Sequence, residues 1–242
     1  MTSNDSAITI PALQRMKVDG RKIVGVVAWD CQIAQIVDRA GVEIVSVGDS
    51  VGVNLWGHAA PDEVTLDEML IVCKAVRRGV KRALVSCDLP PGQDGTDGAI
   101  RLREAGADMV KLADVSQVRS VVRAGIPVFA EFHGGQEPPE KLVEQAKRLE
   151  DAGASFLDFR HSGPVAGEAV VRAVRIPVIG GLGGGPWLDG RIRMVHAAIG
   201  YAASNLNSKT ENYANVARIT LDAIKTYAED VRAARQIRGE RG

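Results

Sequence analysis

Short apolar runs alternate with amphipathic segments along most of this chain. The apolar runs contain few polar positions, which is typical of strands buried on both faces of a parallel sheet. They predict seven strands, at residues 22–29, 44–48, 83–87, 109–112, 128–133, 156–160 and 178–181. The segments between them have apolar residues at helical spacing and predict helices at residues 33–40, 66–78, 100–105, 118–124, 141–152 and 167–174. A weaker eighth strand falls within residues 192–196, before a long C-terminal helix at residues 213–236.

The same helix ending recurs four times. Ala-Gly closes a predicted helix just before an apolar run at residues 40–41, 105–106, 124–125 and 152–153. Glycine after a helix adopts the left-handed conformation that turns the chain back toward the sheet. With eight strand–helix units, this repetition predicts a single (β/α)8 TIM barrel over residues 1–242. A doubly wound open sheet is the alternative, and it is disfavoured because no Gly-x-Gly-x-x-Gly motif follows the first apolar run.

Composition excludes several classes of protein. The chain has 30 Lys+Arg and 30 Asp+Glu, so its charge favours neither nucleic acid nor an anionic membrane as a partner. The sequence contains no apolar run of the ~18 residues that span a bilayer, and its N-terminus has no signal-peptide core. Its three cysteines are scattered without a Cys-x-x-Cys pair. Such cysteines indicate reduced thiols, so we expect a cytoplasmic protein.

Acidic residues follow successive predicted strands, which is where barrel enzymes place their chemistry. Asp49 and Asp88 each follow an apolar run closely. Carboxylates that meet at one barrel mouth repel one another unless a cation lies among them, and their hard oxygens suit Mg2+. We therefore predict that Asp49 and Asp88 bind a divalent metal.

Two further features of the predicted mouth fit a negatively charged substrate. Lys111, in the run Met-Val-Lys-Leu, would neutralise an oxyanion or a substrate carboxylate, or else form a structural ion pair. The glycine-rich run at residues 180–185 would cradle an anion with its backbone N–H groups, although glycines also let loops pack closely.

Short motifs follow one another in a fixed order over nearly the whole chain. They are Ala-Trp-Asp at 28–30, Val-Gly-Asp-Ser-Val-Gly at 47–52, Gly-His at 57–58, Ala-Val-Arg-Arg-Gly at 75–79, Asp-Leu-Pro at 88–90, Ala-Gly-Ala-Asp-Met-Val-Lys at 105–111, Ile-Pro-Val-Ile-Gly at 176–180, Asp-Gly-Arg-Ile at 189–192 and Val-His at 195–196. This set resembles the ketopantoate hydroxymethyltransferase family. The family belongs to the wider group of phosphoenolpyruvate mutases and isocitrate lyases, and the resemblance implies the same barrel.

The resemblance also implies a reaction. In the family, a divalent metal chelates the carboxylate and keto oxygen of 2-oxoisovalerate, acidifies the neighbouring C–H and stabilises the enolate. The enolate then takes a one-carbon unit from methylenetetrahydrofolate. Asp49 and Asp88 match the metal carboxylates, through which the substrate is bound. Ser50 matches a residue that binds the substrate carboxylate, and Lys111 matches the lysine that helps to hold the substrate. A homo-oligomer is expected, because the family assembles into multimers.

The metal site departs from the family at one position. The family's third metal acid lies two residues after the lysine, where this chain has Ala113. Asp114 would face the opposite way in a regular strand, so it could replace that acid only through a bulge or an early strand end. Glu131, which stands where the family has an active-site histidine, is the other candidate for a third metal ligand.

Arg160 changes the expected chemistry further, because it stands where the family has its base, a glutamate. An arginine cannot accept a proton at neutral pH. Its guanidinium would bind a second anionic group of the substrate, or pair with Asp158 or Glu131 and balance the charge of the mouth. The segment at residues 134–139 is also shorter than the family's loop over the site, which predicts a weaker dependence on a large folate donor.

Three functions follow from these residues. The first is a hydroxymethyltransferase or related aldol-type transferase acting on a small 2-oxo acid, with Lys111, Glu131 and Arg160 as candidate catalytic residues. The second is a carbon–carbon lyase or decarboxylase, which would use the same enolate in the opposite direction. The third is a catalytically silent paralogue that binds a small ligand. Retention of Asp49, Ser50, Asp88 and Lys111 favours an enzyme. The replacements by Ala113 and Arg160 favour the silent paralogue.

Overall fold

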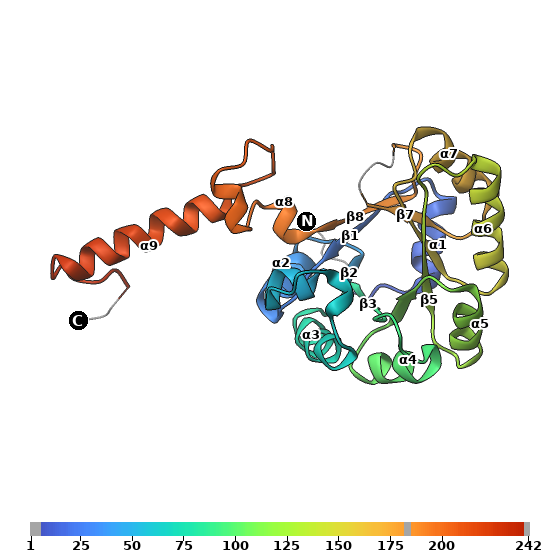
Figure 1. Ribbon diagram of the computed structural model, residues 1–242, viewed down its shortest axis with the longest axis horizontal. Helices are drawn as coiled ribbons and strands as arrows, with labels where there is room; N and C mark the ends of the chain where they lie inside the picture. Colours follow the sequence, from blue (N-terminus) through green and yellow to red (C-terminus); the bar gives the residue numbers. More distant parts are fainter. Residues whose placement is uncertain (1–5, 182–184, 240–242) are drawn as a thin grey trace. The chain divides into compact units, whose positions relative to one another are not determined.

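Eight parallel strands close into one barrel in the computed structural model, which describes residues 6–181 and 185–239 (Figure 1). Each strand pairs with its neighbours in chain order, from β1 round to β8. The strands are β1 (Ile23–Val27), β2 (Ile44–Val47), β3 (Leu84–Asp88), β4 (Met109–Leu112), β5 (Val128–His133), β6 (Phe156–Arg160), β7 (Val178–Gly180) and β8 (Gly190–Met194). The predicted (β/α)8 barrel is therefore confirmed, and the open-sheet alternative is wrong.

Helices surround this barrel (Figure 1). The α-helices are α1 (Ile10–Val18), α2 (Cys31–Arg39), α3 (Leu66–Gly79), α4 (Gly95–Glu104), α5 (Val115–Arg123), α6 (Pro139–Asp151) and α7 (Pro164–Ala173). A π-helix, η1 (Gly52–Trp56), and a 3-10 helix, η2 (Pro61–Glu63), connect β2 to α3. Every residue of β2, β3 and β4 is buried, as expected for strands with helices on one face and the barrel interior on the other.

The amino-terminal end of the barrel is filled by apolar side chains. Leu13 and Met16 of α1 pack there against the first residues of the strands, including Ile23, Phe129 and Phe156. The two phenylalanine rings meet edge to face, with centroids 6.0 Å apart. Since this end is apolar, the polar interior residues described below are gathered toward the carboxyl ends of the strands.

The four predicted Ala-Gly turns are present. Gly41, Gly106, Gly125 and Gly153 have φ values of 87°, 108°, 76° and 100°. A side chain is strained in this left-handed region, so glycine allows each helix to end and the next strand to begin within a few residues.

Several element boundaries differ from the sequence prediction for a local reason. Asp94 accepts hydrogen bonds from the backbone N–H groups of Thr96 and Asp97, so α4 begins at Gly95 rather than at residue 100. The eighth strand is β8 at Gly190–Met194, earlier than predicted, and residues 195–198 form the short helix α8 (Val195–Ala198). Helix α1 was not predicted.

The chain forms two compact units, Met1–Arg193 and Met194–Gly242. The second unit contains α8, the 3-10 helix η3 (Ala203–Leu206) and the long helix α9 (Val216–Arg232). Helix α9 is shorter than the predicted 213–236, because the Asn215 side chain caps its start by accepting a hydrogen bond from Arg218 N. Among the residues that the structure describes, no helix is both long and apolar enough to cross a membrane.

Candidate active site

Charged side chains from four neighbouring strands meet inside the barrel near its carboxyl end. Asp88 ends β3, Lys111 lies in β4, Glu131 in β5, and Asp158 and Arg160 in β6. Strand register places Asp88 beside Lys111 and Glu131 beside Asp158. Side chains two residues apart point to the same face of a strand, so His133 and Arg160 form a layer above Glu131 and Asp158.

Lys111 is the centre of this cluster. Its ammonium group lies 2.9 Å from Asp158 Oδ2, 3.4 Å from Asp88 Oδ1 and 3.7 Å from Glu131 Oε2. The side chain is only 4% exposed, and its Nζ also lies 5.4 Å from the centroid of the Phe129 ring. Burial alone would lower the pKa of Lys111, but Asp158 and Asp88 outweigh burial and raise it. Lys111 therefore remains a fixed cation, and the predicted ion-pair alternative is the arrangement present.

Arg160 closes the cluster from the solvent side. Its Nη2 lies 2.7 Å from Glu131 Oε2 and 4.0 Å from Asp88 Oδ2, and its Nε lies 3.4 Å from Asp158 Oδ2. Of the two roles expected for Arg160, the structure shows the pairing with Glu131 and Asp158. Glu131 and Arg160, two of the candidate catalytic residues, are thus in direct contact.

The cluster holds more negative than positive charge. Burial raises the pKa of Asp88 to about 6; Lys111 opposes this rise, whereas Asp49 and Glu131 add to it. Burial would also raise the pKa of Asp158, but Lys111 and Arg160 outweigh burial and hold it below its usual value. Asp88 is therefore the carboxylate whose ionised form is disfavoured in this cluster, whereas the ionised form of Asp158 is stabilised by the two cations.

Asp49 and Ser50 follow β2 at the same end of the barrel, and both are partly exposed. The backbone N–H of Asp49 donates to Asp88 Oδ2 at 3.3 Å. The Asp49 charge raises the pKa of both Asp88 and Arg160, so this side chain acts on the cluster electrostatically. The structure thus places the backbone of Asp49 beside Asp88, and their binding of a metal stays a prediction.

Asp114 lies apart from the cluster. It is the N-cap of α5, and its carboxylate accepts hydrogen bonds from Gln117 N and the Ser116 hydroxyl. Asp114 and Ala113 are both exposed. Since its carboxylate is committed to the helix start, Asp114 does not supply the third acid that the sequence allowed. The glycine-rich run of residues 180–185 lies partly outside the described residues, at 182–184.

A divalent cation fits Asp49 and Asp88. The carboxylates of this region outnumber its two cations, Lys111 and Arg160, so two negative charges are left unbalanced. The four carboxylates are those of Asp49, Asp88, Glu131 and Asp158. Asp88 Oδ1 is buried and forms an ion pair with Lys111 at 3.4 Å, but it has no hydrogen-bond partner, so it keeps acceptor capacity for a ligand. Within the described ranges, no group of three or more His, Cys, Asp or Glu residues is placed to hold a metal ion. Glu131 is committed to Arg160 and His133, so we limit the candidate ligands to Asp49 and Asp88.

His133 lies two residues after Glu131, and no role was predicted for it from the sequence. Its Nε2 is 3.1 Å from Glu131 Oε1, and its side chain is 56% exposed. The ring of His161, from the turn after β6, lies 6.2 Å away and nearly parallel. His161 has a φ of 52°, unusual for a residue other than glycine. Residues two apart in a strand share a face, so the sequence could have predicted that His133 lies on the same side of β5 as Glu131.

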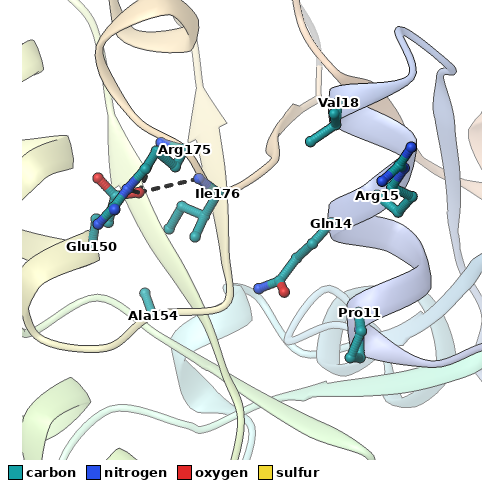
Figure 2. Close-up of a pocket in the computed structure, with 8 residues that line it drawn as sticks. All are labelled: Pro11, Gln14, Arg15, Val18, Glu150, Ala154, Arg175 and Ile176. Atoms are coloured by element: carbon teal, nitrogen blue, oxygen red, sulfur yellow. Dashed lines mark hydrogen bonds and ion pairs between the residues drawn. The ribbon is translucent and has the colours of Figure 1, made fainter.

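A cavity of about 470 Å³ lies elsewhere in the barrel unit. Figure 2 shows Gln14 of α1 facing Ile176 and Ala154 across this cavity, with Arg175 and Glu150 on the far side. Ala154 and Ile176 precede β6 and β7, so the cavity opens at the amino-terminal ends of the strands. It is therefore separate from the charged cluster.

The chain is similar to known enzymes over most of its length. The sequence profile described as ketopantoate hydroxymethyltransferase matches residues 7–139 and 132–236. A 3-methyl-2-oxobutanoate hydroxymethyltransferase of Cyanothece sp. is 37% identical, with 93% of this chain and 96% of the relative covered. The enzyme of that name from Staphylothermus marinus is 33% identical, with coverages of 93% and 92%.

Solved structures with the same fold are more distant in sequence. A 2,3-dimethylmalate lyase of the PEP mutase/isocitrate lyase superfamily gives a TM-score of 0.63 at 15% identity, covering 96% of this chain and 90% of the other. A phosphoenolpyruvate phosphomutase from Streptomyces platensis subsp. rosaceus gives 0.64 at 14% identity, covering 94% and 89%.

Proposed function

Because the chain belongs to the ketopantoate hydroxymethyltransferase family, we propose that it transfers a one-carbon unit to the carbon next to the keto group of a small 2-oxo acid. The observation that carries this proposal is the cluster at the barrel mouth. Asp88 lies 3.4 Å from a buried cation, Lys111, and accepts a hydrogen bond from the backbone of Asp49, in a site with two unbalanced negative charges. A site of this kind can bind a cation and a small anion together.

Asp49 and Asp88 would hold the divalent metal, Mg2+ being the ion that suits their oxygens. Bound there, the metal would polarise the keto group of the substrate and make the neighbouring C–H more acidic. Ser50, directly after Asp49, would donate its hydroxyl to the substrate carboxylate. Lys111 would hold Asp88 in place and add positive charge near the oxygen on which negative charge develops.

Arg160 and Glu131 would shape the mouth as a pair. The guanidinium lies above the buried layer and is 31% exposed, so one side of it faces the solvent where the substrate enters. Its contacts with Glu131 and Asp158 already satisfy much of its charge, which supports a 2-oxo acid with one carboxylate over one with two. The donor would be a one-carbon unit at the oxidation level of formaldehyde, with methylenetetrahydrofolate as the donor that the family resemblance implies.

Proton exchange tests this function without assuming a donor. In D2O with Mg2+, the wild-type protein should replace the C–H next to the keto group of 2-oxoisovalerate or a related 2-oxo acid with deuterium, as followed by 1H NMR. Asp88→Asn and Asp49→Asn should abolish the exchange, and Asp114→Asn should not, because Asp114 only caps α5. Absence of exchange with every small 2-oxo acid tested would overturn the proposal.

We also propose that the protein is a cytoplasmic homo-oligomer. The family resemblance supports self-association, and Cys31, Cys73 and Cys87 are all free thiols, which suits a reducing compartment.

A further inference from the structure

His133 is the exposed end of the charged cluster. It is the last residue of β5 and lies on the same strand face as Glu131, beside Arg160 in the strand register. Glu131 joins the two layers of the cluster: Oε1 lies 3.1 Å from His133 Nε2, and Oε2 lies 2.7 Å from Arg160 Nη2. The imidazole is therefore held in the outer layer of the cluster, with 56% of its side chain exposed, and Glu131 connects it to the groups below.

The hydrogen bond to Glu131 determines which nitrogen of His133 is available. An ionised carboxylate only accepts hydrogen bonds, so Nε2 must carry the proton that it shares with Glu131. In the neutral ring, the remaining nitrogen, Nδ1, then has a free lone pair. This is the arrangement of a histidine that is ready to accept a proton.

The other charged groups of the cluster are poorly suited to accept a proton. Lys111 and Arg160 are fixed cations, each in contact with carboxylates. Asp158 is 1% exposed and is held by both cations, which keep its pKa low. Asp49 and Asp88 are the proposed metal ligands. Among the groups that the structure describes in this cluster, His133 combines a free lone pair with access to the mouth.

We propose that His133 is the catalytic base of this protein, a role that rests on the function proposed above. The C–H bond next to the keto group breaks, its proton is transferred to His133 Nδ1, and its electron pair forms the enolate. The imidazole becomes an imidazolium ion, whose positive charge is stabilised by Glu131. Water first releases the one-carbon unit from its donor as formaldehyde, leaving the free tetrahydrofolate when that is the donor. The enolate carbon then bonds to the formaldehyde carbon, the π pair of its C=O bond moves to oxygen, and the proton on His133 Nδ1 is transferred to that alkoxide.

Glu131 is a positioning residue in this scheme. It orients the imidazole and fixes the proton on Nε2, as a carboxylate does for a histidine in other acid–base pairs. Arg160, which faces His133 from β6, opposes the imidazolium charge, and Glu131 lies between the two. His161 is the other titratable group facing His133, and its ring lies 6.2 Å away.

The test compares hydrogen–deuterium exchange of the 2-oxo acid by wild type and His133→Gln at a series of pH values. The variant should exchange about 10²- to 10⁴-fold more slowly, which is the usual contribution of a general base. The exchange rate of the wild type should rise with pH as His133 loses its proton, and this rise should be absent from His133→Gln. Binding of Mn2+, measured by titration, should be unchanged, because His133 is not a proposed metal ligand.

Three further variants keep the test independent of folding effects. His133→Gly should regain part of its exchange rate when free imidazole is added. His161→Asn is the matched control, since asparagine tolerates the left-handed backbone at this position, and it should exchange at the wild-type rate. Glu131→Gln should slow the exchange, because a carboxamide can also donate a hydrogen bond to Nε2 and no longer fixes the tautomer of His133, and it should leave Mn2+ binding unchanged.

The outcomes separate this inference from the proposed function. If the wild type exchanges and His133→Gln exchanges equally fast with the same pH profile, His133 is not the base, and the proposed function stands. If the wild type exchanges no 2-oxo acid, the proposed function and this inference are both overturned.

Discussion

A single buried ammonium group holds three carboxylates together at the mouth of the barrel. Lys111→Met would remove that charge and leave Asp88, Glu131 and Asp158 with Arg160 as their remaining cation. Breaking a buried ion-pair network by removing one partner costs about 3–5 kcal/mol. We expect a loss of unfolding free energy of that size, measured by chemical denaturation.

The matched control is Lys147→Met, because Lys147 is exposed on α6. It should change the unfolding free energy by less than about 0.5 kcal/mol, as is usual for surface substitutions. Equal effects of the two substitutions would show that Lys111 does not stabilise the cluster.

Asp88 links the stability of the metal-free protein to pH. Burial raises its pKa from 3.8 to about 6, so between these values the folded chain holds a proton that the unfolded chain has released. Since the folded state binds more protons in this window, stability must fall as pH rises through it and stay lower above it. The total loss is at most about 3 kcal/mol, at about 1.4 kcal/mol per pKa unit.

Denaturation of wild type and Asp88→Asn at about pH 4 and about pH 8 measures this effect. The variant lacks the ionisable group, so its stability relative to wild type should be greater at the higher pH. Added Mg2+ should stabilise the wild type at the higher pH and leave Asp88→Asn unchanged. If the stability difference between wild type and Asp88→Asn were the same at both pH values, the pKa of Asp88 would not be raised in the folded protein.

Single residues of the site were predictable where their position along one strand was sufficient. Asp49 and Asp88 each follow an apolar run closely, and the carboxyl ends of parallel strands meet at one end of a barrel. The contact between Glu131 and Arg160 was not decided, because it depends on the register of β5 against β6 and on the side-chain conformations. His133 was passed over because its role depends on that same contact.

Helices α2 and α3 approach closely at a glycine. A Cβ atom added to Gly79 would lie 2.5 Å from the carbonyl oxygen of Cys31 and 2.8 Å from the Cβ of Ala34. Alanine is favoured over glycine in a helix by about 1 kcal/mol, but overpacking of this kind costs about 1–3 kcal/mol. Gly79→Ala should therefore destabilise the protein in spite of its better helix propensity, and thermal unfolding measures the sign.

The double variant Gly79→Ala/Ala34→Gly distinguishes the two clashes. It removes the contact with the Ala34 side chain and leaves the contact with the Cys31 backbone, so it should remain less stable than Ala34→Gly alone. An increase in stability on adding Gly79→Ala to Ala34→Gly would show that the helices can separate at little cost.

Elements were predictable where hydrophobic spacing repeats, and less so at their ends. The strand at residues 109–112 and the strand at 128–133 agree with β4 and β5 to the residue. Helices α4 and α5 begin earlier than predicted, because Asp94 and Asp114 cap them ahead of their apolar residues. A capping aspartate resembles a site aspartate in sequence, and for Asp114 only the structure separates the two roles.

At the scale of the whole molecule, helix α9 has an apolar stripe that this chain leaves exposed. Ile224, Tyr227 and Val231, spaced as one helix face, are 60%, 54% and 49% exposed. Exposed apolar stripes of this kind mark association surfaces. If the stripe contributes to the proposed homo-oligomer, Ile224→Lys should shift the sedimenting species toward the single chain.

Glu229→Lys is the matched control, because it introduces the same side chain on the polar side of α9 and should leave the oligomer intact. A wild-type protein that sediments only as a single chain at micromolar concentration would contradict the oligomer. An oligomer that is unaffected by Ile224→Lys would place its interface elsewhere.

The barrel architecture was more predictable than single residues or element ends, because the same Ala-Gly turn from a helix to the next strand occurs four times along the chain. Closure of the sheet follows from eight units in succession, and it does not depend on any one boundary. The second compact unit, from Met194, was not foreseen, since nothing in its hydrophobic spacing separates it from the preceding strand.

The 2.7 Å pairing of Glu131 with Arg160 has a consequence for substitutions at these two positions. Without Arg160, Glu131 would keep Lys111, 3.7 Å away, as its nearby cation, whereas without Glu131, Arg160 would keep its contacts with Asp158 and Asp88. Because the two side chains are in contact, the effects of substituting them should not be additive. Replacing both with uncharged residues should therefore cost less unfolding free energy than the sum of the two single replacements.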